Sequence, residues 1–220
     1  TYEIDAVFEY MRDRKVMLIP ILKNHVIHPC INSVCAIYIY TEDDVERIIP
    51  ISHYEQLTGF SQHIQRFLDL ENIFVHDKKT WLQIGGNPNV FDIKTLWWYT
   101  YGESYDETYY PTATHTFYWR RHQTLPAVNC IIPLQKHLEM CQKIRHYAWP
   151  MCMNAKLDAS YVTFNSTYPE VFAQIESVGL HVTDEFRMPE LITAGFVFSN
   201  YNYHTVTGRP SNAYRGFNYA

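Results

Sequence analysis

Eight residues, Thr205 to Asn212 (TVTGRPSN), combine the side-chain types that nucleic-acid contacts use. A glycine lets the backbone approach a phosphate or a groove closely, because it carries no Cβ. An arginine next to it can reach base edges, sugar oxygens or phosphates. Gly208 and Arg209, set between hydroxyl and amide side chains, are therefore compatible with a nucleic-acid contact. The alternative is an ordinary surface turn, since Gly, Pro and Ser favour turns in any protein.

This segment resembles the T-x-T-G-R-L-S-S element of family A (polymerase I-like) DNA polymerases. Pro210 stands where the family has Leu, and Asn212 stands where it has the second Ser. The resemblance implies that the segment opens a polymerase palm and that Arg209 contacts the primer-template near the primer end. It also implies a set of residues that shape this loop, namely Thr207, Gly208, Ser211, Asn212 and Asn218.

A second stretch resembles the proofreading exonuclease domain of the same polymerases. There, a strand ends in a segment like H-N-x-K-x-D, and F-D-T opens a helix shortly afterwards. Phe91 and Asp92 match the later segment. The earlier one is degenerate, because Asp77 stands near the family's Asn and Trp81 stands where its catalytic Asp belongs. Asp77, Trp81 and Asp92 are therefore interpreted as degenerate exonuclease positions.

The carboxylates that such a nuclease requires are missing from this sequence. Its mechanism needs several carboxylates that converge on a pair of Mg²⁺ ions. The family has an Asp-x-Glu pair on its first strand, whereas residues 16–22 (VMLIPIL) contain no acid. Its third motif, a Tyr followed four residues later by Asp, has no counterpart in residues 134–147, where Glu139 is the one acid. We therefore expect a scaffold without proofreading activity, with no catalytic residue and no metal site.

Hydrophobic patterning predicts the elements that position these residues. Strands are expected at residues 16–22, 34–40, 47–51 and 72–76, the first three as an antiparallel meander. Helices are expected at residues 62–70, 78–84, 93–100, 134–147 and 168–178. This order predicts an α/β fold with a mixed sheet and helices, compatible with an RNase H-like or exonuclease-like domain over residues 1–150. A helical and strand-loop extension, residues 151–220, would resemble the start of a palm.

The charge balance limits how nucleic acid is bound. The net charge is −5, from 18 Lys and Arg against 23 Asp and Glu. Phosphate contacts supply most non-specific affinity, so a free-standing duplex binder usually has a basic surplus. Any contact must therefore be local or shared with a partner. The five cysteines form no CxxC pair and no apolar run has membrane-spanning length, which together predict a cytoplasmic protein with reduced thiols and no membrane contact.

Two further groups of residues invite functional readings. Arg120 and Arg121 lie in an aromatic stretch without clear periodicity, and are predicted to be a weak DNA or partner contact. Trp97 and Trp98 could stack on bases, but packing of their helix against the sheet is favoured. Two His and Cys sets have spacings compatible with zinc, although neither forms a recognisable quartet. These sets are His25-His28-Cys30 and His137-Cys141-His146.

The leading hypothesis is a DNA replication protein: a non-catalytic or split N-terminal subunit of a family A-like polymerase, of the sort phage genomes encode. The family's palm carboxylates and fingers helix have no counterpart before Ala220. A second chain would supply them, and Mg²⁺ is expected only in the completed polymerase. One alternative is a structural protein that uses the inactive fold as a scaffold. Another is a divergent nuclease using Asp77, Asp92 and Asp106.

Overall fold

The structure is a computed structural model that describes residues 2–23, 29–55, 59–103, 114–115, 130–131, 133–181 and 196–212. Within them lies a five-stranded sheet of order β3-β2-β1-β4-β5. Its strands are β1 (Val16–Leu22), β2 (Val34–Thr41), β3 (Glu46–Pro50), β4 (Phe74–Val75) and β5 (Phe91–Asp92). β1, β2 and β3 pair antiparallel, whereas β4 is parallel to β1 and β5 to β4. The predicted α/β class with a mixed sheet is confirmed.

The two hydrophobic runs of the sequence, β1 and β2, form the central part of this sheet, where both faces are covered. Every residue of β1 and of β2 is buried. Residues of β1 alternate between two core clusters, so that Met17, Ile19 and Ile21 face one side and Leu18 and Leu22 the other. Such two-sided burial explains why the strands read as continuous apolar runs rather than as an alternating pattern.

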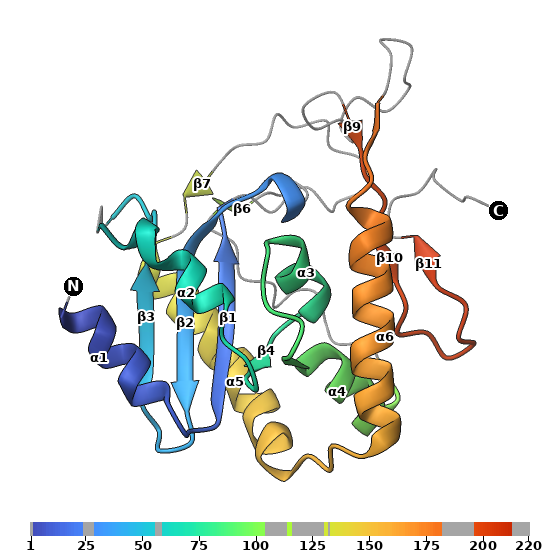
Figure 1. Ribbon diagram of the computed structural model, residues 1–220, viewed down its shortest axis with the longest axis horizontal. Coiled ribbons are helices and arrows are strands. Elements are labelled where there is room, and N and C mark those ends of the chain that lie inside the picture. Colours follow the sequence, from blue (N-terminus) through green and yellow to red (C-terminus); the bar gives the residue numbers. More distant parts are fainter. Residues whose placement is uncertain are drawn as a thin grey trace.

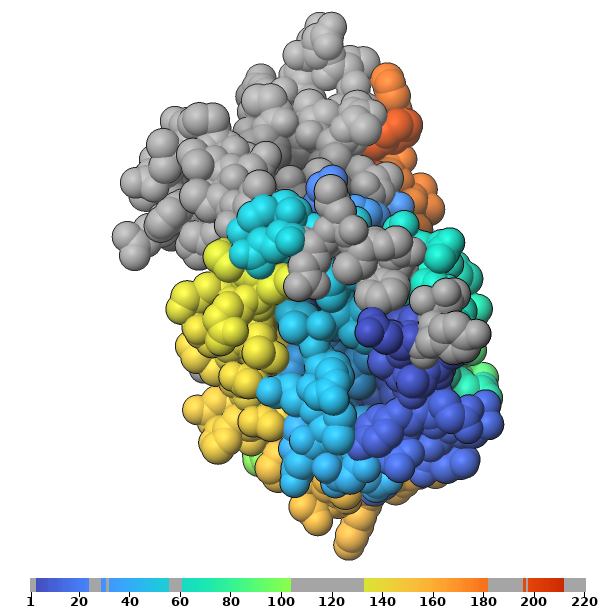
Figure 2. All heavy atoms as spheres, turned by 90° about the vertical axis from the view of Figure 1, so that its left-hand side faces the viewer, coloured from blue at the N-terminus to red at the C-terminus, as the bar shows by residue number. Residues whose placement is uncertain are grey.

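Helices cover the two faces of the sheet (Figure 1). α1 (Tyr2–Met11) and α2 (Ile64–Leu68) pack on the face of Leu18 and Leu22. α4 (Ile93–Tyr101) and α5 (Leu134–Asn154) pack on the opposite face. Figure 2, which looks onto the β3 edge, shows the sheet between α1 and α5. The strand that carries Pro50 is thus at the edge, where a residue without a backbone N–H is tolerated.

Beyond β5 stands a long helix, α6 (Ala159–Glu176), with α3 (Lys78–Gln83) between it and the sheet (Figure 1). A small hairpin of β10 (Tyr201–Asn202) and β11 (Ser211–Asn212) lies beside α6. The remaining short elements are η1 (Pro29–Ile31), η2 (Gly59–His63), β6 (Thr114–His115), β7 (Cys130–Ile131), β8 (Leu180–His181) and β9 (Phe196–Val197).

Two predicted helices have different bounds in the structure. The helix expected to start at Tyr168 starts at Ala159, so that prediction was wrong. Its true start signal is Asp158, whose carboxylate accepts a hydrogen bond from the backbone N of Tyr161 at 2.8 Å. Pro169 lies inside α6 instead of opening it. α5 runs to Asn154 and so crosses residue 150 without a break, while the domain boundary placed there stays a prediction.

The thiols and the helices bear on the expected environment of the chain. Cys30, Cys35, Cys141 and Cys152 are free thiols, and the last three are buried. Burial raises the pKa of Cys35 to about 12, so this thiol stays protonated and packs as a small apolar side chain. None of the helices in the described ranges is both long and apolar enough to span a membrane.

Candidate functional site

A group of buried charged residues follows the carboxyl ends of β4 and β5. Parallel pairing brings these two strand ends to the same edge of the sheet, which is where ligands of α/β proteins usually bind. The residues at this edge, together with a partner on α6, are here called the polar cluster: Asp77, Lys79, Asp92, Lys94 and Glu176. The cluster contains two of the three positions that the sequence assigns to a degenerate exonuclease site.

Asp77 is the N-cap of α3 and is already neutralised. One of its oxygens accepts from the backbone N of Thr80 at 3.1 Å, and the other accepts from Lys94 Nζ at 3.2 Å. Burial acts to raise the pKa of Asp77, but Lys94 and Lys79 outweigh it, so that the pKa lies well below its ordinary value. Asp77 therefore stays ionised with an ammonium group as its counter-ion.

Asp92 caps α4 and is completely buried. Its carboxylate accepts from the backbone N of Lys94 at 3.0 Å and from Thr95 Oγ1 at 2.6 Å. Burial, together with the nearby charge of Asp77, raises the pKa of Asp92 to about 6. Thr95 Oγ1 also lies 3.0 Å from His204 Nε2, so a buried hydrogen-bonded chain links Asp92 to the segment after β10. Both oxygens of the Asp92 carboxylate are therefore engaged in hydrogen bonds within the protein.

Asn165 on α6 occupies a position that the sequence predictions missed. It lies four residues after Tyr161, which reproduces the Tyr-x-x-x-Asp spacing of the third exonuclease motif with an amide in place of the carboxylate. Its Oδ1 accepts from the backbone N of Asp92 at 2.8 Å, and its Nδ2 donates to the carbonyl of Val90 at 3.0 Å. Tyr161 donates to the carbonyl of Asp92 at 3.3 Å. The signal was hidden because the helix was predicted to begin only at residue 168.

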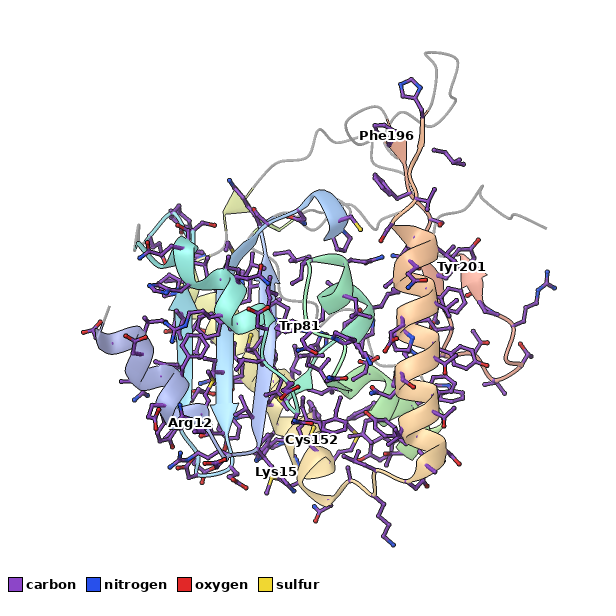
Figure 3. The ribbon with its side chains drawn as sticks, in the orientation of Figure 1. Arg12, Lys15, Trp81, Cys152, Phe196 and Tyr201 are labelled. Atoms are coloured by element: carbon purple, nitrogen blue, oxygen red, sulfur yellow. The ribbon has the colours of Figure 1, made fainter. Side chains whose placement is uncertain are left out.

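Apolar side chains stand at the other two positions where the exonuclease family has its carboxylates, namely Trp81 and strand β1. Trp81 is completely buried among the residues of the α1 and α2 face, in the space between β1 and α3 (Figure 3). Its indole Nε1 donates to the carbonyl of Asn87 at 3.0 Å. On β1, Ile19 and Ile21 pack in the same core cluster as Tyr161. Neither position provides an oxygen that could ligate a metal ion.

Lys79 and Glu176 connect the polar cluster to the hairpin. Lys79 Nζ donates to Glu176 Oε1 at 2.9 Å, to Asn200 Oδ1 at 2.9 Å and to the carbonyl of Tyr201 at 2.7 Å. Glu176 also accepts from the backbone N of Tyr201 and, at 3.0 Å, from Gln83 Nε2. Burial raises the pKa of Glu176, an effect that the Lys79 ammonium opposes. The first residue of β10 is thus bound to α3 and α6 at once, and Figure 3 shows Tyr201 beside α6.

The hairpin presents the TVTGR segment at its tip. The backbone N of Gly208 donates to the carbonyl of Thr205 at 3.0 Å, and Thr205 Oγ1 donates to the carbonyl of Arg209 at 2.9 Å. Gly208 has φ +68°, a conformation that favours glycine, and a Cβ there would meet open space. Val206 is 92% exposed, and Thr207 and Arg209 are exposed as well. The glycine is therefore required by the turn itself, and the turn points its side chains outwards.

The structure describes only some of the residues that were predicted to contact nucleic acid. Ser211 is exposed on β11, and Asn212 ends that strand. Asn218, Arg120 and Arg121 lie outside the described residues, as does Asp106 of the alternative nuclease. Thr207, Gly208 and Arg209 thus lie in the turn of the hairpin, whereas Ser211 and Asn212 form its second strand.

The described side chains provide no cluster of three His, Cys, Asp or Glu residues that could hold a metal ion. Of the zinc candidates on α5, His137 and Cys141 are buried, whereas His146 is exposed. Trp97 packs against the core and lies 4.5 Å, centroid to centroid, from Tyr101, and Trp98 stacks on Phe164 at 5.3 Å. Both tryptophans therefore pack within the domain, as the packing interpretation predicts, because each ring contacts a neighbouring aromatic ring.

Comparison with known proteins identifies no relative of this chain. No model of a known protein family matches the sequence, and no curated protein is significantly similar to it.

Proposed function

We propose that the chain is a non-catalytic, exonuclease-like part of a family A-like DNA polymerase that contributes primer-template binding through its hairpin. The palm carboxylates and the fingers would be supplied by a second chain. The Mg²⁺ ions needed for polymerisation would be held there, because the carboxylates of the polar cluster are engaged by ion pairs or hydrogen bonds within this chain.

The sheet topology supports the exonuclease-like part of this proposal. The order β3-β2-β1-β4-β5, with β2 antiparallel to both of its neighbours and β4 and β5 parallel to β1, is compatible with an RNase H-like or exonuclease-like domain. A sheet order alone is shared by proteins of many functions, so function has to be argued from the residues of the site.

The observation that carries the proposal is how the predicted nuclease positions are occupied. An indole stands at Trp81, an amide at Asn165, and buried apolar side chains along all of β1. The acids that remain at these positions are held by the protein: Asp77 is paired with Lys94, and Asp92 accepts from the backbone N of Lys94 and from Thr95 Oγ1. A two-metal mechanism needs several carboxylates facing the ions, and this arrangement supplies none that is free of a protein partner.

The hairpin supports the nucleic-acid part. Arg209 and Thr207 are exposed on a tight turn, and the chain's acidic excess makes a local contact of this kind more plausible than a broad basic face. The side chains there are suited to sugar and phosphate contacts, which position a protein on a duplex without reading its sequence.

The alternative of a scaffold or interaction protein is favoured by one feature of α6. Apolar side chains at Val162, Val171 and Ile175 are about half exposed on this helix, and Val178 just after it is 67% exposed. Exposed apolar groups gathered on one helix are typical of surfaces that bind another protein.

The experiment that tests the proposal uses a fluorescent primer-template with Mg²⁺ and nucleotides. We expect the protein to bind this DNA, to bind it about tenfold more weakly as Arg209→Ala, and to leave the primer unchanged in length. A shortened primer would instead establish the divergent nuclease, with Asp92→Ala as its first mutational test. Failure of the wild-type chain to bind DNA, alone or with its partner, would favour the scaffold protein.

A further inference from the structure

The hairpin that carries Arg209 is too small to hold its own geometry. β10 and β11 each contain two residues, and an isolated two-stranded hairpin is marginally stable at best in water. Its position must therefore come from contacts with the rest of the domain. The described residues make three such contacts, at Tyr201, at Tyr203 and at His204.

The contact at Tyr201 has the largest number of hydrogen bonds. The three donors of the Lys79 ammonium are matched by three acceptors, and two of those, Asn200 Oδ1 and the carbonyl of Tyr201, belong to the start of the hairpin. The third is Glu176, which in turn accepts from the backbone N of Tyr201. The side chains of Lys79 and Glu176 are 9% and 1% exposed, so water does not compete effectively for these bonds.

The other two contacts are made by side-chain rings. The ring of Tyr203 stacks on Phe172 of α6 with centroids 5.2 Å apart and planes 9° from parallel. His204 reaches Thr95 Oγ1, which is itself bound to Asp92. Both hold the hairpin against α4 and α6, but neither binds the backbone of β10.

Lys78, the preceding residue, provides an internal comparison. It is also buried and also pairs with α6, through Glu170 Oε1 at 3.1 Å. Glu170 belongs to α6 and not to the hairpin. Two adjacent buried lysines of the same helix thus differ in one respect that matters here, which is whether the ammonium group reaches β10.

We propose that Lys79 is a positioning residue for the hairpin, and that the presentation of Arg209 to nucleic acid depends on the bonds of its ammonium group to Asn200 and Tyr201. The attachment itself is independent of the function of Arg209. Only its consequence for nucleic-acid binding rests on the proposed function. Lys79 makes this contribution from within the domain, without touching the ligand.

The attachment is tested by amide hydrogen exchange in the full chain. In Lys79→Met we expect the amides of Tyr201, His204 and Gly208 to exchange about tenfold faster or more, because a hydrogen bond to a charged group is lost. In Lys78→Met, which removes the same charge from the same helix, these amides should exchange as in the wild type. Wild-type exchange of the hairpin in Lys79→Met would overturn the proposal.

A second variant separates positioning from the effect of a stranded buried charge. Lys79→Met alone leaves Glu176 without its cation, which can weaken the whole domain. The double variant Lys79→Met/Glu176→Gln removes both charges and keeps an oxygen that can accept from the backbone N of Tyr201. Amides of β1 and β2 should return to wild-type exchange in this variant while those of the hairpin stay fast. Recovery of the hairpin together with the core would show that charge and not attachment was at fault, against the proposal.

The consequence for binding is tested with the labelled primer-template. We expect Lys79→Met to weaken binding about as much as Arg209→Ala, roughly tenfold, and the combined variant to be no weaker than either, because both act through one contact. Multiplying losses in the combined variant would overturn the positioning role. Absence of DNA binding by the wild type would refute the proposed function alone, since the exchange experiment would still decide the attachment.

Discussion

The polar cluster and the hairpin tip both gather charged and polar side chains, but they treat them in opposite ways. In the cluster, Asp77 is paired with Lys94 and Glu176 with Lys79, all at low exposure. At the tip, Arg209 is exposed, and the described part of the chain gives it no carboxylate partner. Charges that are satisfied inside the protein fix its geometry, whereas a charge left in water is available to a ligand.

The difference shows why position in the fold is a poor guide to activity. The strand ends at β4 and β5 are where an α/β protein usually keeps its ligands. Here, that place is filled by ion pairs and helix caps, and the exposed polar groups lie on a hairpin distant in sequence. The following predictions test this contrast, beginning with the largest expected effect.

Removal of Asp77 should be strongly destabilising. Asp77→Ala removes the carboxylate that pairs with the Lys94 ammonium at low exposure and removes the N-cap of α3, a loss expected to cost about 3–5 kcal/mol of unfolding free energy. Urea denaturation followed by circular dichroism measures it. The control is Lys136→Ala, which breaks an exposed pair with Glu139 and should cost about 0–1 kcal/mol. Equal effects of the two variants would contradict the contrast between cluster and surface.

Acidification should destabilise the protein between pH 7 and pH 5. Burial lowers the pKa of His76 and of His204 to about 3 and that of His137 to about 4, so the unfolded chain binds protons in this range that the folded chain does not. Asp92 opposes this, because its pKa of about 6 lets the folded state take up a proton first. Glu176 opposes it in the same way, because burial raises its pKa too. The three histidines outweigh the two carboxyl groups, and the net loss should be on the order of 2–4 kcal/mol.

The variant Asp92→Asn sharpens this test, because it removes one of the two opposing groups. Its loss of stability from pH 7 to pH 5, measured by urea denaturation at each pH, should be larger than that of the wild type. A smaller loss would mean that Asp92 does not take up its proton in that range.

Placing an acid at position 165 should cost stability. In Asn165→Asp the carbonyl of Val90 loses its donor and a carboxylate is buried close to Asp92, which together should cost about 2–3 kcal/mol at pH 7. Thermal and urea unfolding measure the change. Ser166→Asp adds an acid at the next, exposed position of α6 and should change stability by about 0.5 kcal/mol or less. A neutral Asn165→Asp would mean that the site still tolerates a metal-ligating carboxylate.

The smallest effect on stability is expected at the hairpin tip. Arg209→Ala should change the unfolding free energy by less than about 0.5 kcal/mol, because the side chain is exposed. The same variant should lower the salt dependence of DNA binding by about one phosphate contact, measured by fluorescence anisotropy across a salt series. A large loss of stability would place Arg209 with the cluster and not with the ligand-binding surface.

Four of the five strands of the main sheet could be predicted from sequence because each carries its own signal, whereas β5, with two residues, was not among the expected strands. The runs at Val16–Leu22 and Val34–Thr41 are long, apolar and β-branched, and Asp77 and Asp92 stand before helices where they act as caps. The start of α6 was missed because Pro169 was taken as a first-turn proline. The residues that follow the true N-cap, Asp158, show only a weak apolar periodicity, and Pro169 was the clearer start signal.

The connections between distant segments could not be predicted from sequence. Lys79 and Tyr201 lie far apart along the chain, and no local pattern shows that an ammonium group on α3 meets the carbonyl of β10. Asn165 is similar, since its role depends on the backbone of Val90 and Asp92. The sequence shows which residues are polar, but not which of them are buried or which backbone atoms they face.

The hydrogen bonds made by the backbone of Tyr201 limit where a further strand can pair with the hairpin. An exposed strand edge is a template for another strand, either from a partner or in aggregation. At Tyr201 both backbone polar groups are engaged by Lys79 and Glu176, so strand addition on that side of β10 is blocked. A further strand would have to join at β11. The polar cluster therefore gives this small sheet a direction of extension, away from the domain and on the side of Ser211 and Asn212.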